Sequence, residues 1–186
     1  KDVDVTGVIN YKIPEVDRYL LERKGCFARL RLFDPRYQAK LGLTGRVVSI
    51  DLDVVVCGDL YPLFYRSESF MILQGANAKN PCPYNGSLWM IRAGYRPDVW
   101  NMFSTEAAEK VPAYEFSDDQ GWLHWCVPNA SGWRAGSASG VYAFRKPGWP
   151  PGADDLPEDA RLVCFPGWRD PSQFTDVPWI GYHWAA

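Results

Sequence analysis

The run Arg46–Val56 is the feature that most constrains how this chain folds, because apolar and mostly β-branched residues there surround Asp51 and Asp53. Runs this apolar are typical of strands covered on both faces of a sheet. An ionised carboxylate is costly to bury without a compensating cation or hydrogen-bond donor. Side chains two residues apart on a strand point the same way, so both carboxylates can reach one ion. Oxygen ligands suit a hard divalent cation, so the run predicts a strand that ends at a Mg²⁺ or Mn²⁺ site. The alternative, from these residues alone, is that one Asp caps a turn and the other is solvated.

The composition narrows the class of protein. At 186 residues, of which 47% are apolar and 23% charged, the chain suits one globular domain with a sizeable core. A net charge of −2 argues against nucleic acid as a partner. No stretch reaches the ~18 uncharged apolar residues that a membrane span needs, and the first residues lack a secretory signal pattern. The five cysteines are odd in number and without CxxC spacing, which favours reduced thiols, so we expect a cytoplasmic protein.

Hydrophobic periodicity and turn residues indicate strands that alternate with helices. Strands are expected at residues 46–51, 70–74, 86–91, 141–144 and 162–165, and helices at 25–33 and 96–109. A turn followed by a short helix is expected at residues 58–64. A further helix is expected after Ser117, which would cap its N-terminus, whereas Asp34-Pro35 is expected to end the first helix. The Pro- and Gly-rich residues 146–159 are expected to form a loop. This alternation predicts an α/β fold with a mixed sheet.

Four segments, in this order and spacing, resemble motifs of the GT-A glycosyltransferases, in particular the family 8-like retaining enzymes. They are Gly25–Phe33, Ser49–Leu60, Tyr84–Ile91 and Asp118–Gln120. The second segment holds the Asp-x-Asp motif of that family, followed by Gly-Asp-Leu. The resemblance covers residues 25–170 and implies a single domain with a Rossmann-like mixed sheet flanked by helices. It also implies transfer of a sugar from a nucleoside-diphosphate sugar, with a UDP-sugar as the expected donor, to a glycan or other acceptor.

The resemblance assigns the donor diphosphate to three charged residues. Asp51 and Asp53 would hold Mn²⁺ or Mg²⁺, which stabilises the diphosphate leaving group as a Lewis acid. Asp53 is expected to be the direct ligand, with Asp51 shared with the ribose. Arg29 would add a fixed positive charge near the diphosphate or the ribose. From the sequence alone, Arg29 reads equally well as a surface arginine of a helix.

The same resemblance places four residues around the transferred sugar. The Asn85 amide can both donate to and accept from sugar hydroxyls, and Gly86 permits close approach of the backbone. Asp119 would bind donor or acceptor hydroxyls, and Gln120 would lie beneath the anomeric carbon. Neither is assigned the role of nucleophile. Without the resemblance, these residues describe a turn before a strand and the charged first turn of a helix.

The C-terminal part departs from the family pattern. Family members close the metal site with a His in a His-x-x-Gly-x-x-Lys-Pro segment, and here Cys164 stands at the His position and Asp170 at the Lys position. A thiolate is a soft ligand that matches Mg²⁺ or Mn²⁺ poorly, so Asp170 or water would complete the site. Gly167 and Arg169 are expected beside the donor, with Arg169 replacing the lysine charge. The two histidines, His124 and His183, are expected to be structural.

The N-terminal part departs as well, because family members begin with a strand and helix that cradle the base. We expect residues 1–24 to be a remnant of that nucleotide-binding half, residues 25–170 to form the core, and residues 171–186 to form a tail. The oligomeric state, the donor sugar and the acceptor stay open.

Two other functions fit parts of the sequence. A metal-dependent phosphohydrolase or nucleotidyltransferase would use Asp51 and Asp53 at the same sheet edge, but it leaves the Asn-Gly-Ser and Asp-Asp-Gln segments without a role. The other is a catalytically inactive sugar-binding module of the same fold, which the changed metal segment and N-terminus would allow.

Overall fold

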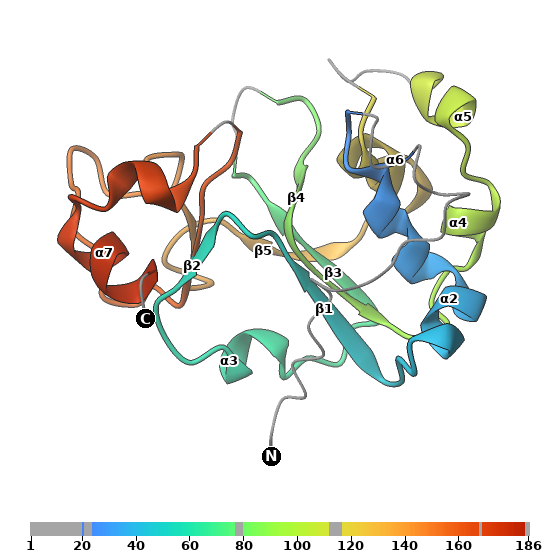
Figure 1. The fold of residues 1–186 in the computed structure, drawn as a ribbon, viewed down its shortest axis with the longest axis horizontal. Helices are drawn as coiled ribbons and strands as arrows, with labels where there is room; N and C mark the ends of the chain where they lie inside the picture. The colour runs from blue at the N-terminus through green and yellow to red at the C-terminus, as the bar shows by residue number, and fades with distance from the viewer. Residues whose placement is uncertain (1–19, 21–23, 77–79, 112–116, 168, 185–186) are drawn as a thin grey trace.

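The structure is a computed structural model that describes Leu20 and residues 24–76, 80–111, 117–167 and 169–184 (Figure 1). Most of the expected N-terminal remnant, residues 1–24, lies outside these described residues. Two mixed sheets lie next to each other, each covered by helices or loops on its outer side. The expected α/β fold with mixed sheets flanked by helices is therefore confirmed.

The larger sheet has four strands, in the order β1-β4-β3-β5. They are β1 (Arg46–Ile50), β4 (Tyr84–Arg92), β3 (Phe70–Gln74) and β5 (Ser131–Arg134). The strand β4 pairs antiparallel with both β1 and β3, whereas β3 and β5 are parallel. The long strand β4 therefore forms the middle of this sheet, and β1 stands at one end of the described strand order.

The smaller sheet has three strands, in the order β2-β7-β6. They are β2 (Val54–Val56), β7 (Leu162–Cys164) and β6 (Val141–Ala143). The strand β7 pairs antiparallel with β2 and parallel with β6. Because only three residues separate β1 from β2, the chain passes directly from the larger sheet into the smaller one.

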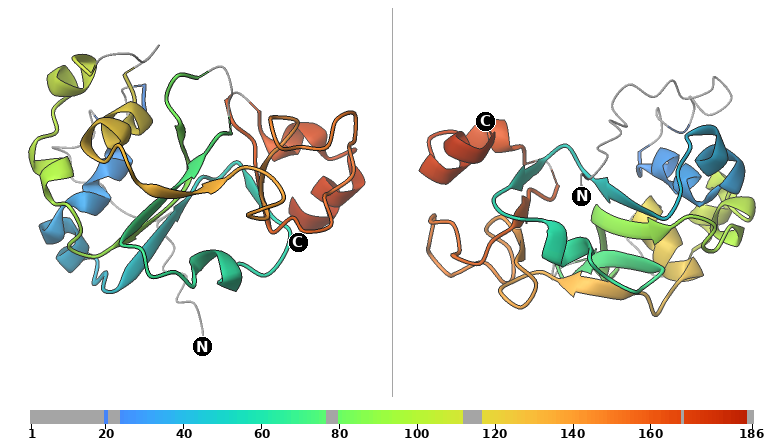
Figure 2. Two further views of the ribbon diagram at one scale, coloured as in Figure 1. Left: turned by 180° about the vertical axis from the view of Figure 1, so that it is seen from behind. Right: turned by 90° about the horizontal axis from the view of Figure 1, so that it is seen from below.

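Short helices cover the outer sides of the two sheets. The larger sheet carries the 3-10 helix η3 (Phe27–Phe33), α2 (Pro35–Lys40), α4 (Asp98–Asn101), α5 (Thr105–Glu109) and α6 (Asp119–Cys126), on the right in Figure 1. The smaller sheet carries η4 (Pro171–Phe174) and α7 (Pro178–Trp184), on the left, and α3 (Tyr61–Phe64) follows β2. Figure 2 shows from behind and from below that the two sets of helices lie at opposite ends of the molecule. No helix of the described residues is long and apolar enough to cross a membrane.

Three apolar clusters fill the spaces between these layers. One lies between the larger sheet and its helices and includes Trp89, and another lies between the smaller sheet and α7 and includes Phe144. The middle cluster draws on strands of both sheets, with Met90 and Leu162 fully buried in it. Because successive side chains of a strand point to opposite faces, Val54 enters the middle cluster and Val55 the outer one. The middle cluster is what holds the two sheets together.

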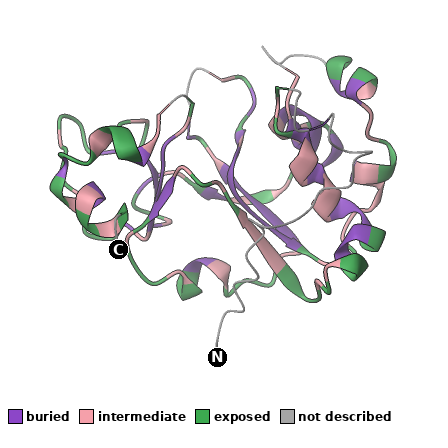
Figure 3. Ribbon diagram, viewed as in Figure 1, coloured by how far each residue is buried: buried purple, intermediate pink, exposed green. Residues whose placement is uncertain are grey.

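The strand β1 differs from its prediction. Its apolar run predicts burial on both faces, yet Arg46 and Ile50 are exposed and the three residues between them are only half-buried. Figure 3 shows this contrast with the buried β4. The reason is position in the sheet, because β1 pairs with β4 on one side only among the described residues.

Three helix predictions also need correction. The helix predicted for residues 25–33 is a 3-10 helix and begins only at Phe27. Pro35 opens α2 instead of only ending the first helix, because Asp34 accepts a hydrogen bond from the Arg36 N–H as its N-cap. The residues 96–109 split into α4 and α5 because the Ser104 side chain caps a new helix. The last of the predicted helices, α6, is capped by Asp118 and not by Ser117.

Candidate functional site

The carboxylates Asp51 and Asp53 lie in the three-residue link between the two sheets. The Asp51 N–H donates to the Ser87 carbonyl of β4 at 3.0 Å, and the Asp53 carbonyl accepts from the Phe165 N–H after β7 at 3.0 Å. Asp51 is thus fixed to the larger sheet and Asp53 to the smaller one. The prediction that both side chains project from one strand is wrong, because β1 ends at Ile50 and the chain bends before β2 begins.

Arg29 of η3 is the centre of a buried network. Its Nη1 lies 3.0 Å from Asp51 Oδ1 and also donates to the Gly86 carbonyl, and its Nε lies 3.0 Å from Asp119 Oδ2. Burial alone would lower the pKa of Arg29, but the carboxylates of Asp119 and Asp51 more than offset this and hold it above the ordinary value. The guanidinium is therefore an internal counter-ion for two carboxylates and a restraint on β4 at the same time.

Asp119, in the first turn of α6, is almost completely buried. Its N–H donates to the Gly25 carbonyl at 2.8 Å, which ties α6 to the start of η3. Burial raises the pKa of its carboxyl to about 7, and the charge of Arg29 opposes this rise. The site can therefore hold or release a proton at Asp119 near neutral pH.

Gly86 lies where β4 passes this network, and a larger residue there would displace the Arg29 side chain. A Cβ at this position would lie 2.8 Å from Arg29 Nη1 and 3.3 Å from Asp119 Oδ2. Its N–H donates to Gln120 Oε1 at 3.0 Å. The Asn85 side chain accepts from the Ser87 N–H at 3.1 Å, which fixes the local turn of β4. The absence of a side chain at Gly86 thus lets Arg29 and Asp119 lie close to β4.

The residues fit a divalent cation only in part. Burial, and then the charge of Asp51, raise the pKa of Asp53 to about 6. Cys164 is fully buried, and burial together with the charges of Asp51 and Asp53 raises its thiol pKa well above the ordinary value, so the sulfur stays protonated. Cys164 thus lies near the two carboxylates without being suited as a ligand. Within the described ranges, three His, Cys, Asp or Glu side chains are nowhere grouped so that they could hold a metal ion. The donor set suits a hard ion that takes its other ligands from water and a diphosphate, and does not suit a closed protein site.

The segment after β7 has mainly structural contacts. The Arg169 guanidinium donates to the Phe144 carbonyl at 2.6 Å, and Gly167 has a positive φ of 91°. Asp170 caps η4, because its Oδ1 accepts from the Ser172 N–H at 2.8 Å. Burial and the charge of Asp51 raise the pKa of Asp53, and the charge of Asp170 adds a smaller rise.

The two histidines each pack against a tyrosine ring. The His124 ring packs edge-to-face on Tyr84 with centroids 4.9 Å apart, and burial lowers its pKa. His183 packs edge-to-face on Tyr182 near the C-terminus. The structural roles expected for both stay predictions.

Asp118 is a polar residue of the network that sequence reasoning did not assign to the site. Its Oδ1 caps α6 by accepting from the Gly121 N–H at 2.7 Å, and its Oδ2 accepts from Gln120 Nε2 at 2.9 Å. Both Ser and Asp are common N-caps, so the pattern did not distinguish Asp118 from Ser117. The Ser117 hydroxyl is buried without a hydrogen-bond partner in the described structure.

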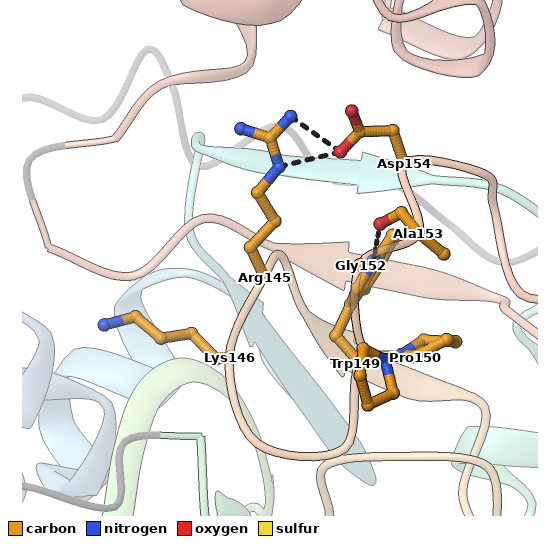
Figure 4. A pocket seen from close by; sticks show the side chains of 8 residues that line it. Arg145, Lys146, Trp149, Pro150, Gly152, Ala153 and Asp154 are labelled. Atoms are coloured by element: carbon orange, nitrogen blue, oxygen red, sulfur yellow. Dashed lines mark hydrogen bonds and ion pairs between the residues drawn. The ribbon is translucent and has the colours of Figure 1, made fainter.

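A cavity of about 500 Å³ lies on the loop after β6, away from this network (Figure 4). Arg145 and Asp154, two residues of its lining, form an ion pair with Nη2 and Oδ1 2.6 Å apart. Both side chains are largely exposed to solvent. The ion pair leaves Lys146 as the remaining charged residue of the lining.

The arrangement of sheets and helices is that of the GT-A glycosyltransferases. It is similar to a crystal structure of the galactosyltransferase LgtC in complex with donor and acceptor sugar analogues, with a TM-score of 0.52 and 16% identity. The match covers 84% of this chain and 66% of LgtC, so the chain spans just under two thirds of the length of that protein. A second LgtC structure, of the active-site mutant Q189E, matches with a TM-score of 0.48 and 15% identity over 81% of this chain and 65% of that one. No protein-family model and no curated protein sequence matches the chain. At this identity the likeness establishes the fold alone.

Proposed function

We propose that the chain binds a nucleoside-diphosphate sugar, with UDP as the expected nucleotide, and transfers the sugar to a glycan or another acceptor with retention of configuration. The observation that carries this proposal is the network around Arg29. Four segments far apart in the sequence each contribute to it: Arg29, Asp51, Gly86 and Asp119 with Gln120. These are the segments whose motifs resemble the GT-A enzymes. The fold of the LgtC neighbour, whose structure holds donor and acceptor sugar analogues, supports the same function.

Each residue of the candidate site would have a separate role. Asp53, with Asp51, would hold Mn²⁺ or Mg²⁺ through carboxylate oxygens, and the ion would supply Lewis-acid stabilisation of the departing diphosphate. Arg29 would keep Asp51 and Asp119 in place as charge accumulates nearby, because a guanidinium can hold two carboxylates at once. Asn85 and Gln120 would orient sugar hydroxyls through their amides. Gly167 and Arg169 would lie beside the diphosphate. The protein would act in the cytoplasm.

Calorimetry with UDP and UDP-galactose, in Mn²⁺ and in EDTA, tests the proposal. We expect binding of both in Mn²⁺, and at least a tenfold weaker binding in EDTA and in Asp53→Ala. Asp154→Ala is the matched control, because it removes a carboxylate from an exposed ion pair distant in sequence from the network. Equal affinity for UDP in EDTA and Mn²⁺ would refute the metal part, and absence of any UDP or UDP-galactose binding would refute the nucleotide-sugar part.

Turnover assays separate this function from the two others. Hydrolysis of UDP-galactose in Mn²⁺ is expected, because water can replace the unidentified acceptor. Turnover of p-nitrophenyl phosphate in its place would favour the phosphohydrolase. Binding of UDP-galactose without any hydrolysis would favour the inactive sugar-binding module.

A further inference from the structure

The side-chain amide of Gln120 is held between two groups whose chemistry admits one orientation only. The Gly86 N–H is always a donor, and it faces Oε1 at 3.0 Å. The Asp118 carboxylate is an acceptor, and its Oδ2 faces Nε2 at 2.9 Å. A flipped amide would place the Nε2 group against a backbone N–H and the oxygen against a carboxylate. The two partners therefore determine which way the amide points.

These two bonds leave the amide with further capacity. A glutamine side chain has two N–H donors and two lone pairs on its oxygen, and Gly86 and Asp118 use one of each. The other donor and lone pair keep a fixed direction as long as the two bonds persist. A group with a fixed donor and a fixed acceptor is suited to a sugar hydroxyl, which can accept and donate.

Asp118 is itself held from the other side. Its Oδ1 accepts from the Gly121 N–H at 2.7 Å as the N-cap of α6, so the carboxylate has no freedom to follow Gln120. We propose that Asp118 is a positioning residue that fixes the Gln120 amide toward the transferred sugar, in addition to capping α6. The inference rests on the proposed function for the identity of the ligand. The fixed orientation itself does not depend on it.

A swap of donor and acceptor tests this role. In Gln120→Glu two carboxylates would face each other, and in Asp118→Asn two amide N–H groups would do so. The double variant restores one donor and one acceptor, because the amide introduced at position 118 can donate to the carboxylate introduced at position 120. That carboxylate can still accept from the Gly86 N–H. A residue that only caps α6 would show no such rescue.

The first readout is the backbone amide signal of Gly86 in ¹⁵N-labelled protein. We expect it to shift in each single variant and to return toward the wild-type position in the double variant. Additive shifts in the double variant would overturn the proposal. Asp118→Ser keeps an N-cap oxygen for α6 and covers the case in which a single variant does not fold. Ser104→Ala, which removes the N-cap of α5, is the matched control and should leave the Gly86 signal in place.

The second readout is the ratio of the affinities for UDP-galactose and UDP. Each single variant should lower this ratio about tenfold, as expected when a hydrogen bond that involves a charged group is lost. UDP affinity itself should change less than about threefold, because Gln120 is assigned to the sugar. A uniform loss for both ligands would overturn the assignment to the sugar. If the wild-type protein binds neither ligand, the proposed function fails, whereas the Gly86 signal still decides whether Asp118 positions Gln120.

Discussion

Replacing Arg29 by methionine removes the counter-ion of two carboxylates while keeping most of the apolar length of the side chain. The Asp119 side chain is 3% exposed and that of Asp51 is 27% exposed, so the pair with Asp119 dominates the energetics. Breaking a buried pair by removing one partner costs about 3–5 kcal/mol, because an uncompensated charge stays buried. We expect a loss toward the lower end of this range in the free energy of unfolding of Arg29→Met at pH 8.5, because Asp119 can take up a proton when its counter-ion is gone.

The loss should be smaller at pH 5. The pKa of Asp119 is raised to about 7 in the folded protein from an ordinary value of 3.8, so the folded state binds a proton there that the unfolded state has released. Stability therefore falls as the pH rises from about 4 to about 7 in the wild type. Without Arg29, whose charge lowers this pKa, the fall continues to higher pH. Each unit by which Arg29 lowers the pKa is worth about 1.4 kcal/mol. At pH 5 the folded Asp119 is neutral in both proteins, so only the pair with Asp51 and the bond to the Gly86 carbonyl are lost.

Urea unfolding followed by tryptophan fluorescence, at pH 5 and pH 8.5, measures both losses. Arg29→Met combined with Asp119→Asn should recover stability at pH 8.5, because the buried charge is gone. Arg36→Met is the control, since that guanidinium is 87% exposed and its pair with Asp34 should contribute less than about 1 kcal/mol. Equal losses for Arg29→Met at the two pH values would refute the electrostatic reasoning and assign the effect to packing.

Three further predictions concern the rest of the fold. Gly132→Ala should lower the free energy of unfolding, measured by urea titration, by about 3 kcal/mol or more. The added Cβ would lie 2.3 Å from the Ile72 carbonyl oxygen, between two parallel strands. A loss under about 1 kcal/mol would contradict this. A thiol reagent should label the exposed Cys26 in the native protein and the three buried thiols only after unfolding, which mass spectrometry can follow. Met90→Ala and Ile180→Ala should each lower the free energy of unfolding by about 2–5 kcal/mol. Only Met90→Ala, in the cluster that joins the sheets, should also weaken UDP binding. Equal effects of the two variants on UDP binding would count against that cluster's role.

Sequence patterns located the strands well where a strand lies inside a sheet. The residues 70–74 form β3 as predicted, and β4 contains the predicted residues 86–91 and begins two residues earlier. The burial of β1 could not be predicted from its sequence. An apolar run looks the same whether the strand pairs with a neighbour on one side or on both. The predicted helix over 96–109 is split because Ser104 caps the start of α5. Hydrophobic periodicity alone does not reveal such a cap.

The candidate site was predictable as a set of residues but not as a set of contacts. The resemblance selected Arg29, Gly86, Asp119 and Gln120, and all four contact one another or a shared neighbour. It placed the Arg29 charge near the diphosphate, whereas the structure shows the guanidinium engaged with two carboxylates and a carbonyl. Partners 57 residues apart in sequence, such as Arg29 and Gly86, are brought together by the packing of α6 against both β4 and η3. That packing is a property of the whole core.

The Asp51-Leu52-Asp53 link ties the candidate site to both sheets. Asp51 is bonded through its backbone to β4, and Asp53 is bonded to the residue that follows β7. The separation of the two carboxylates is therefore set by how the two sheets pack, and the middle cluster determines that packing. Between them, Leu52 is 74% exposed, so the link itself adds little to the core. A ligand that contacts both carboxylates would bind to both sheets at once, and its affinity would depend on residues that never touch it.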